Sequence, residues 1–270
     1  CLVQNGRVEG QQPADLLTPV QGDTAGAPMF WNLDYAKAIS AMHKMPIDTL
    51  DDYLAVLAVH MQDSVKRGAM GFKLGATPMV APDRNAARTE YLEVLKGARA
   101  GIQLHSVVWD FVCATAGRLG KTVAVHTGVW GDYRTNDPKL IMDAVMRHPQ
   151  TRFDIYHLGF PSTRDVIFIV KNNPNAWANL CWSWIVSPTI TREAVNELLD
   201  LVPVNKVTAF GADYSFNVEC VYGHLQMARE GLAEAFTDRI ARGWLGLDDA
   251  RHILKMWLFD NPASLYGLSL

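Results

Sequence analysis

Three short apolar runs in this chain each end on a side chain that can bind a metal or transfer a proton. KTVAVHTGVW contains His126, FDIYHLG contains His157 and VTAFGADYS contains Asp213, each with a glycine close by. Imidazole nitrogens and carboxylate oxygens are ligands for zinc, manganese, iron and nickel. Because a bound divalent ion lowers the pKa of its water toward about 7, these residue types could support hydrolysis at neutral pH.

The three residues suit different parts of that chemistry. Asp213, beside an activated water, could take its proton, and His157 could polarise a substrate carbonyl or act as a further ligand. A single histidine or aspartate at a strand end is more often satisfied by loop backbone. The same pattern at three strand ends favours a functional site.

The elements that would position these residues are strands alternating with helices. We predict strands at the following runs: Ala69–Leu74, Thr122–His126, Phe153–His157, Ala176–Cys181 and Val207–Asp213. Helical patterns lie between them, and one begins at Asp137-Pro138, where aspartate is a good N-cap and proline fits the first helical position. Repeated βα units predict a parallel sheet covered by helices.

A doubly wound sheet and a (β/α)8 TIM barrel share this local pattern. The barrel is favoured because barrel enzymes build their sites from the C-terminal ends of several strands. An open sheet would concentrate its site at one switch point, and no glycine-rich phosphate loop follows any strand. Side chains alternate along a strand, so His126 shares a face with Ala124, and Asp213 with Gly211. Such small residues suit a crowded barrel axis.

Residues 1–67 are predicted to be mainly helix and loop, with Gln11–Pro28 rich in glycine and proline. The expected barrel is therefore incomplete at its N-terminus, and a chain that starts at Cys1 is expected to be processed or truncated. No linker or low-complexity segment marks a boundary. We therefore expect a single domain over residues 1–270.

The composition limits the class of partner. The net charge is −3, with 49% hydrophobic and 20% charged residues, as in an ordinary soluble protein. This gives no reason to expect nucleic acid or an anionic membrane as partner, and no apolar run reaches the roughly 18 residues of a membrane helix. Four scattered cysteines without zinc-type spacing fit a reducing cytoplasm. A small-molecule substrate is expected, and a homo-oligomer stays possible.

The motifs VAVHTG, IYHLGFP, FGADYS and WLFDNPASLYGL together resemble the amidohydrolase superfamily. The resemblance is to its amidohydrolase-related (amidohydrolase 2) branch of metal-dependent TIM barrels, and it covers residues 68–270. It implies that His126 and Asp213 bind metal, that Asp213 also acts as base, and that His157 binds metal or orients substrate. The implied cofactor is a divalent ion, zinc first, with manganese, iron or nickel as alternatives.

One feature of that family is missing from this sequence. Its first strand ends in a His-x-His pair of ligands, whereas His43 and His60 stand alone in helical stretches. Either the pair lies upstream of Cys1 or the barrel has lost its metal. The first alternative is favoured, because the expected first strands are missing as well.

Two charged residues are further candidates. Lys73, in GFKLG, stands where some superfamily members carry a metal-bridging carboxylated lysine or a substrate contact. A salt-bridged lysine at the barrel rim is an equally good interpretation. Arg134, on the loop after His126, could hold a substrate carboxylate in its planar fork. The alternative for Arg134 is a surface ion pair with Asp132 or Asp137.

Aromatic residues follow three of the strand ends. Trp130, Trp182, Trp184 and Tyr214 are predicted to wall a pocket for an aromatic or sugar-sized substrate, although packing of loops against the core would account for at least half of them. Cys181 is interpreted as a buried structural thiol, since no partner histidine is identifiable from the sequence. His224, in a helical stretch, is given no role.

The predicted function is hydrolysis of an amide, ester or lactone of a small carboxylated substrate by a metal-dependent enzyme. A decarboxylase or a uronate-isomerase-like enzyme on the same barrel is the first alternative, because the family resemblance extends to both. A non-catalytic barrel without the first-strand His-x-His is the alternative from another class. The substrate is left open, because loops at the barrel mouth set specificity.

Overall fold

The computed structural model divides into two compact units, which are described separately below. The first unit is Cys1–Val125 with Asp143–Arg152, and the second is His126–Met142 with Phe153–Leu270. The described residues are 2–5, 18–22, 32–129, 131–214 and 218–268. Among these residues, no helix has the length and apolar character needed to cross a membrane.

The first unit contains a parallel ladder of β1, β2 and β3, in which Leu2 lies opposite Thr18, and Gln21 opposite Phe72. Its strands are β1 (Leu2–Asn5), β2 (Thr18–Gly22), β3 (Gly71–Gly75) and β4 (Thr122–His126), whose last residue begins the second unit. Its helices are α1 (Leu33–His43), α2 (Leu50–Lys66), α3 (Arg84–Leu95), α4 (Ile102–Arg118) and most of α5 (Met142–Arg147). The strands β1 and β2 were not found by the sequence pattern, because each is short and TPVQG contains proline and glycine, which are depleted in strands.

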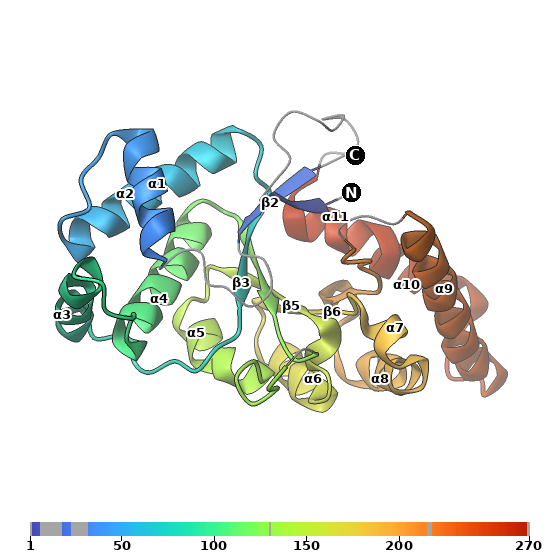
Figure 1. Ribbon diagram of the computed structural model, residues 1–270. Coiled ribbons are helices and arrows are strands. Elements are labelled where there is room, and N and C mark those ends of the chain that lie inside the picture. Colours follow the sequence, from blue (N-terminus) through green and yellow to red (C-terminus); the bar gives the residue numbers. More distant parts are fainter. Residues whose placement is uncertain (1, 6–17, 23–31, 130, 215–217, 269–270) are drawn as a thin grey trace. The chain divides into compact units, whose positions relative to one another are not determined.

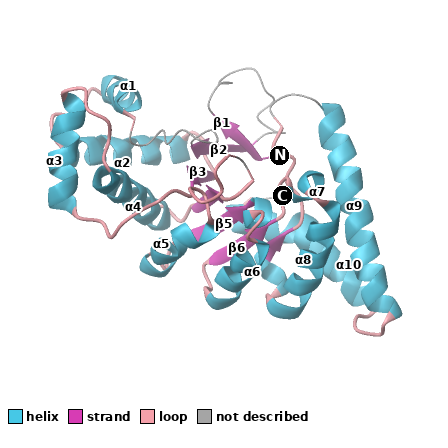
Figure 2. Cartoon of the chain, turned by 60° about the horizontal axis from the view of Figure 1, so that its bottom comes forward, coloured by secondary structure: helices cyan, strands magenta, loops and turns pink. Residues whose placement is uncertain are grey.

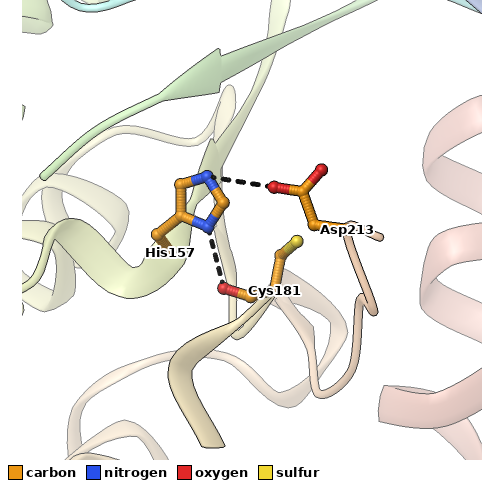
Figure 3. A group of neighbouring side chains, drawn as sticks. All are labelled: His157, Cys181 and Asp213. Atoms are coloured by element: carbon orange, nitrogen blue, oxygen red, sulfur yellow. Dashed lines mark hydrogen bonds and ion pairs between the residues drawn. The ribbon is translucent and has the colours of Figure 1, made fainter. Parts of the chain in front are cut away.

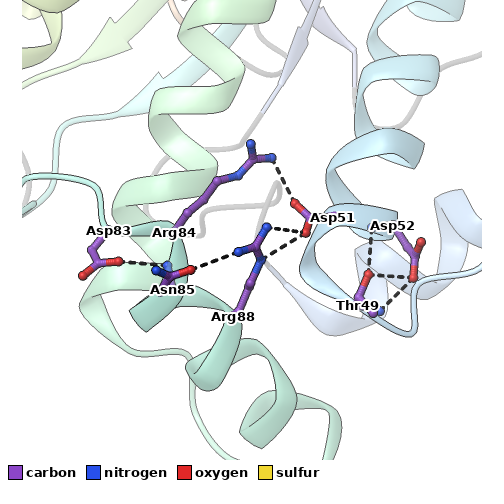
Figure 4. Close-up of polar contacts among 7 residues, drawn as sticks. All are labelled: Thr49, Asp51, Asp52, Asp83, Arg84, Asn85 and Arg88. Atoms are coloured by element: carbon purple, nitrogen blue, oxygen red, sulfur yellow. Dashed lines mark hydrogen bonds and ion pairs between the residues drawn. The ribbon is translucent and has the colours of Figure 1, made fainter.

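Helix α2 begins where its sequence predicts. The Thr49 side chain accepts from the backbone N–H of Asp52, while Asp52 accepts from the backbone N–H of Thr49, so both exposed donors of the first turn are satisfied. Asp51 then pairs with Arg84 and Arg88 of α3 (Figure 4). These ion pairs are half exposed, so they orient the two helices more than they stabilise them.

The second unit is built on a parallel ladder of β5 (Arg152–Tyr156), β6 (Ala176–Asn179) and β7 (Val207–Thr208). Ile155 lies opposite Ala178, and Asn179 opposite Thr208. The predicted strands are therefore present, but β7 is shorter than expected. Past Thr208, the backbone N–H of Ala209 donates to the carbonyl of Trp257 at 3.0 Å instead of continuing the ladder. Asp213 consequently lies on a loop beyond the strand.

Helices cover this second ladder, and α6 packs against both β6 and α8 (Figures 1 and 2). The α-helices are α6 (Thr163–Asn172), α7 (Ser183–Val186), α8 (Pro188–Leu201), α9 (Val218–Ala241), α10 (Leu247–Lys255) and α11 (Asn261–Tyr266). The 3-10 turns are η2 (Pro138–Ile141), η3 (His157–Gly159) and η4 (Val204–Lys206), and a π turn, η5 (Met256–Asp260), precedes α11. The predicted N-cap at Asp137 is confirmed, because its carboxylate accepts from the backbone N–H of Lys139 at 2.8 Å.

The core of the second unit is apolar with one clear exception. Phe153 and Ile155 of β5 and Ala176 and Ala178 of β6 are all fully buried. Parallel strands covered by helices are expected to be apolar on both faces. Asp154 is nevertheless fully buried in the middle of β5.

Candidate metal and catalytic site

His126 is the last residue of β4, and its side chain is buried. The chain turns sharply just after it, because Gly128 has a φ of +62° and a Cβ there would lie 2.0 Å from the carbonyl oxygen of Phe160. The backbone N–H of Val129 donates to that same carbonyl at 2.8 Å. Glycine is thus required at this position, and the close approach fixes the loop that follows His126.

His157 follows β5 and is completely buried. His157, Leu158 and Gly159 have φ values of 64°, 49° and 64°. This left-handed conformation is unfavourable for residues with a Cβ. Such strain is found preferentially at functional sites, where the surrounding structure enforces it.

Asp213 also has a left-handed backbone, with a φ of 54°, and its side chain is 37% exposed. The buried ring of His224, from α9, packs edge-on against Phe210 and Tyr214, with ring centroids 5.1 and 5.9 Å apart. Burial lowers the pKa of His224, and an interaction with the backbone of Ala212 partly opposes this shift. His224 thus supports the loop that carries Asp213, a role that the sequence analysis missed.

The side chains of His126, His157 and Asp213 meet in the second unit. Nε2 of His157 lies 2.9 Å from Nδ1 of His126 and 3.7 Å from Oδ2 of Asp213. Nδ1 of His157 lies 3.0 Å from the carbonyl oxygen of Cys181 (Figure 3). Because a carbonyl only accepts, Nδ1 carries a hydrogen, and whenever the ring is neutral its Nε2 presents a lone pair toward His126 and Asp213.

Cys181 belongs to the same cluster. Its side chain is buried, and the ligand atoms of His157, Cys181 and Asp213 all lie within 4.8 Å of one another (Figure 3). A Cβ on Gly211 would lie 2.9 Å from the Cys181 sulfur, so glycine there leaves room for the thiol. The sequence analysis missed this role, although the AWANLC run ends on a metal-competent residue just as the other three runs do.

These residues fit a divalent transition metal. An imidazole, a thiol and a carboxylate, from His157, Cys181 and Asp213, have ligand atoms within 4.8 Å of one another, and a second imidazole, His126, lies 2.9 Å from Nε2 of His157. The Cys181 carbonyl holds the hydrogen of His157 on Nδ1, away from this group. Zinc accepts nitrogen, oxygen and sulfur ligands in such combinations, while other first-row metals accept many of them. These nitrogen, oxygen and sulfur atoms therefore support a metal site, but they do not determine which metal ion would bind.

The two charged residues predicted to contact metal or substrate, Lys73 and Arg134, lie in different surroundings. Lys73 is on β3 of the first unit with a buried side chain, and its bridging or substrate role stays a prediction. Arg134 is 81% exposed and forms a two-pronged ion pair with Asp132, at 2.6 and 2.8 Å. To bind a substrate carboxylate, Arg134 would have to exchange this partner, and that role also stays a prediction.

Two of the four predicted aromatic residues lie together beside the cluster, whereas Trp184 is fully buried and donates to the carbonyl of Ala209 at 3.1 Å. The rings of Trp182 and Tyr214 have centroids 5.7 Å apart, and these residues directly follow Cys181 and Asp213 in the chain. The backbone N–H of Trp182 donates to the carbonyl of Gly211 at 2.9 Å. Trp130 lies outside the described residues. Substrate binding by these aromatic side chains stays a prediction.

Comparison with known proteins gives a family match and several structural likenesses. A family model described as Amidohydrolase (Amidohydro_2) matches residues 36–268. A Lactobacillus casei ATCC 334 protein, described as an inferred metal-dependent hydrolase, superposes with a TM-score of 0.77 at 14% identity, covering 94% of this chain and 67% of that one. A uronate isomerase from Thermotoga maritima gives a TM-score of 0.77 at 16% identity, covering 93% and 61%. No curated protein matches the sequence.

These structural likenesses confirm the predicted (β/α)8 TIM-barrel fold class. A third likeness, to an IDCase from Metarhizium anisopliae, has a TM-score of 0.51 at 12% identity and covers 93% of this chain and 75% of that one. At such identities a likeness concerns the fold alone. The chain also spans only 61% of the length of the Thermotoga maritima isomerase.

Proposed function

Because this chain belongs to the amidohydrolase family, we propose that it is a metal-dependent hydrolase of an amide, ester or lactone in a small carboxylated substrate. The observation that supports this proposal is the convergence of His126, His157 and Asp213 around Nε2 of His157. These three residues would hold one divalent ion, with zinc the first choice and manganese, iron or nickel as alternatives. Cys181 is close enough to join them.

The bound ion would supply a water of lowered pKa and polarise the substrate carbonyl. Asp213 is the group placed to move protons, because it is the exposed member of the cluster, while His157 is fully buried. Its carboxylate would accept the proton of the attacking water and then deliver it to the leaving nitrogen or oxygen. His157, with its hydrogen held on Nδ1 by the Cys181 carbonyl, keeps Nε2 directed at the reacting groups.

The surroundings of the cluster suit a small substrate with a flat or apolar part. Trp182 and Tyr214 would pack against it, and Arg134 would pair with its carboxylate after exchanging Asp132. A guanidinium binds a carboxylate through two parallel hydrogen bonds, which would orient the scissile bond relative to Asp213.

An isomerase reaction on the same site is the second candidate. Uronate or glucuronate isomerases are among the structural likenesses, with TM-scores of 0.77 for those from Thermotoga maritima and Caulobacter crescentus. Asp213 would then move a proton between neighbouring carbons of a sugar acid rather than from water. A decarboxylase is a further alternative, and a barrel that binds a ligand without turnover remains the alternative from another class.

The test begins with the metal. We would purify the wild-type chain without chelators beside a His126→Ala, Asp213→Ala double variant and measure metals by elemental analysis. Arg164→Ala is a suitable control, because the Arg164 side chain is 78% exposed, pairs with Glu197 and is not one of the proposed ligands. We expect about one equivalent of a transition metal in the wild type and in the control. The double variant should contain almost none.

Product analysis then separates the reactions. An amide, ester and lactone panel would yield a new carboxylic acid if the protein is a hydrolase. Release of carbon dioxide would indicate a decarboxylase, and conversion of an aldehyde to a ketone form of a sugar acid would indicate an isomerase. No metal in the wild type, even after zinc and manganese are supplied, would contradict the proposal and favour the non-catalytic barrel.

A further inference from the structure

Asp154 is a fully buried acidic residue for which the proposed reaction has no use. Its Oδ2 accepts a hydrogen bond from the Tyr266 hydroxyl at 2.8 Å and another from Nδ2 of Asn179 at 2.9 Å. A carboxyl group inside an apolar core is costly unless such donors surround it. Its two donors come from α11 and from β6, so three segments of the second unit meet at one oxygen.

The tyrosine on α11 serves as a hydrogen-bond donor to Asp154. Burial and, after it, the negative charge of Asp154 raise the pKa of Tyr266 well above the ordinary value of a tyrosine. Tyr266 directs its single hydrogen at Asp154, so toward the Tyr156 hydroxyl, 3.3 Å away, its oxygen can only accept. The direction of the bond from Tyr266 to Asp154 is therefore fixed.

Asn179 connects this group to the candidate site. While its Nδ2 donates to Asp154, its Oδ1 accepts from the backbone N–H of Cys181 at 2.9 Å. The amide cannot flip without losing both bonds, so Asp154 fixes its orientation. This bond holds the N–H on one side of the Cys181 Cα, and on the other side the N–H of Trp182 donates to the carbonyl of Gly211 at 2.9 Å. The Cys181 carbonyl between these two anchors receives Nδ1–H of His157 at 3.0 Å.

We propose that Asp154, Asn179 and Tyr266 form a positioning network that holds the Cys181 carbonyl against Nδ1 of His157. The network keeps Nε2 of His157 as the nitrogen that faces His126 and Asp213. The inference rests on the proposed function only where His157 serves as a metal ligand. Its members act through His157 and touch no substrate, so they are positioning residues.

If His157 binds metal, loss of the network should weaken metal binding. A ligating histidine depends on the group that receives its other N–H, and loss of that support typically lowers metal affinity by about 10- to 100-fold. Without the network, the backbone of Cys181 keeps only the anchor from Trp182 to Gly211, so its carbonyl is held less firmly and the neutral ring of His157 can carry its hydrogen on either nitrogen. The network also gives a role to the tyrosine of the C-terminal NPASLYGL run, whose hydroxyl bonds to Asp154 and lies 3.3 Å from the hydroxyl of Tyr156.

Two variants test the network. Asn179→Leu removes both amide bonds at nearly constant volume, and Tyr266→Phe removes only the hydroxyl. The matched control is Tyr53→Phe, because Tyr53 is equally buried and its hydroxyl has no hydrogen-bond partner among the described residues. We would read the tautomer of His157 from the nitrogen chemical shifts of the metal-free protein, assigning the signal with His157→Gln. Zinc affinity would be measured by competition with a chelator.

We expect an Nδ1–H tautomer in the wild type and in Tyr53→Phe, and a mixture of tautomers in both network variants. The change should be larger in Asn179→Leu, with zinc affinity about 10- to 100-fold weaker. An unchanged tautomer in a folded Asn179→Leu protein would overturn the inference. If that variant does not fold, an unchanged tautomer in Tyr266→Phe overturns it instead.

The tautomer measurement needs neither metal nor turnover, so it separates this inference from the proposed function. A wild type that binds no metal but shows the predicted tautomer change would contradict the proposed function while supporting the network. A wild type that binds metal with no tautomer change in the variants would contradict only the network.

Discussion

Strained backbone marks the residues that carry the candidate chemistry. His157, Trp182 and Asp213 all have positive φ values, of 64°, 63° and 54°. Each such conformation costs on the order of 1 to 3 kcal/mol for a residue with a Cβ. These residues lie in the cluster or next to it, where the strain turns side chains toward a common point. This concentration favours a functional interpretation of the cluster over one of ordinary loop packing.

Cys181, interpreted from the sequence as a structural thiol, lies among the possible metal ligands in the structure. A spectroscopic experiment can test whether its sulfur binds the metal. Loading the protein with cobalt(II) should give an intense near-ultraviolet thiolate-to-metal band, because the Cys181 sulfur lies in the ligand cluster. In Cys181→Ser this band should disappear. Cys113→Ser serves as control, because Cys113 is fully buried in the first unit and burial raises the pKa of its thiol. An equal band in wild type and Cys181→Ser would leave His126, His157 and Asp213 as the proposed ligands.

Among the helices, the pairing of α8 with α9 depends on one buried cation. The Arg239 side chain of α9 is 8% exposed. It donates to the side chain and the carbonyl of Asn196 at 2.8 and 2.6 Å, and to Asp200 at 2.6 Å. The bond from Arg239 also lowers the pKa of Asp200. A guanidinium with several donors in a fixed plane suits this set of acceptors, whereas a lysine would satisfy fewer of them.

Replacing that cation should loosen the helix pair. Arg239→Met should lower the free energy of unfolding by about 1 to 3 kcal/mol, because the buried guanidinium is lost and the part-buried amide and carbonyl oxygens of Asn196 lose their donor. Urea titration would measure the change. Arg192→Met is the matched control, since the Arg192–Glu234 pair joins the same two helices but is largely exposed. It should cost at most about 1 kcal/mol. Equal losses in the two variants would contradict the assigned role of Arg239.

At the scale of the whole molecule, stability depends on which histidines stay neutral when the chain folds. Burial first, and then the neighbouring His43, lower the pKa of His60 to about 4, and burial lowers the pKa of His105 to about 4. The unfolded state takes up these protons near pH 6.5, before the folded state does. The contribution of these two neutral histidines to the free energy of unfolding is therefore complete above about pH 6.5, and it is lost as the pH falls toward 4.

This linkage predicts an acid-sensitive fold. Between pH 7 and pH 5 the wild type should lose about 2 kcal/mol of unfolding free energy through His60 alone. His60→Leu should show a correspondingly smaller difference between the two pH values in urea titrations. His252→Leu serves as control for removal of a histidine, because His252 is exposed on α10. A full-sized pH difference in His60→Leu would show that other groups cause the acid sensitivity.

The sequence alone determined the fold class and the main candidate residues. Short apolar runs separated by helical periodicity encode βα units, because alternation and helical spacing are local properties of the chain. Polar residues after such runs stand out for the same reason, so the local pattern is enough to name His126, His157 and Asp213. The motifs around them also identified the family, which the family match confirms over residues 36–268.

The tertiary structure alone decided how those residues work together. Tyr266 lies 112 positions from Asp154, and His157 lies 24 positions from the Cys181 carbonyl, so neither contact leaves a local signal. The thiol of Cys181 likewise reaches the cluster only because Gly211 makes room for it. Local patterns specify elements, whereas the orientation of a side chain and the tautomer of a ring depend on groups that folding brings together.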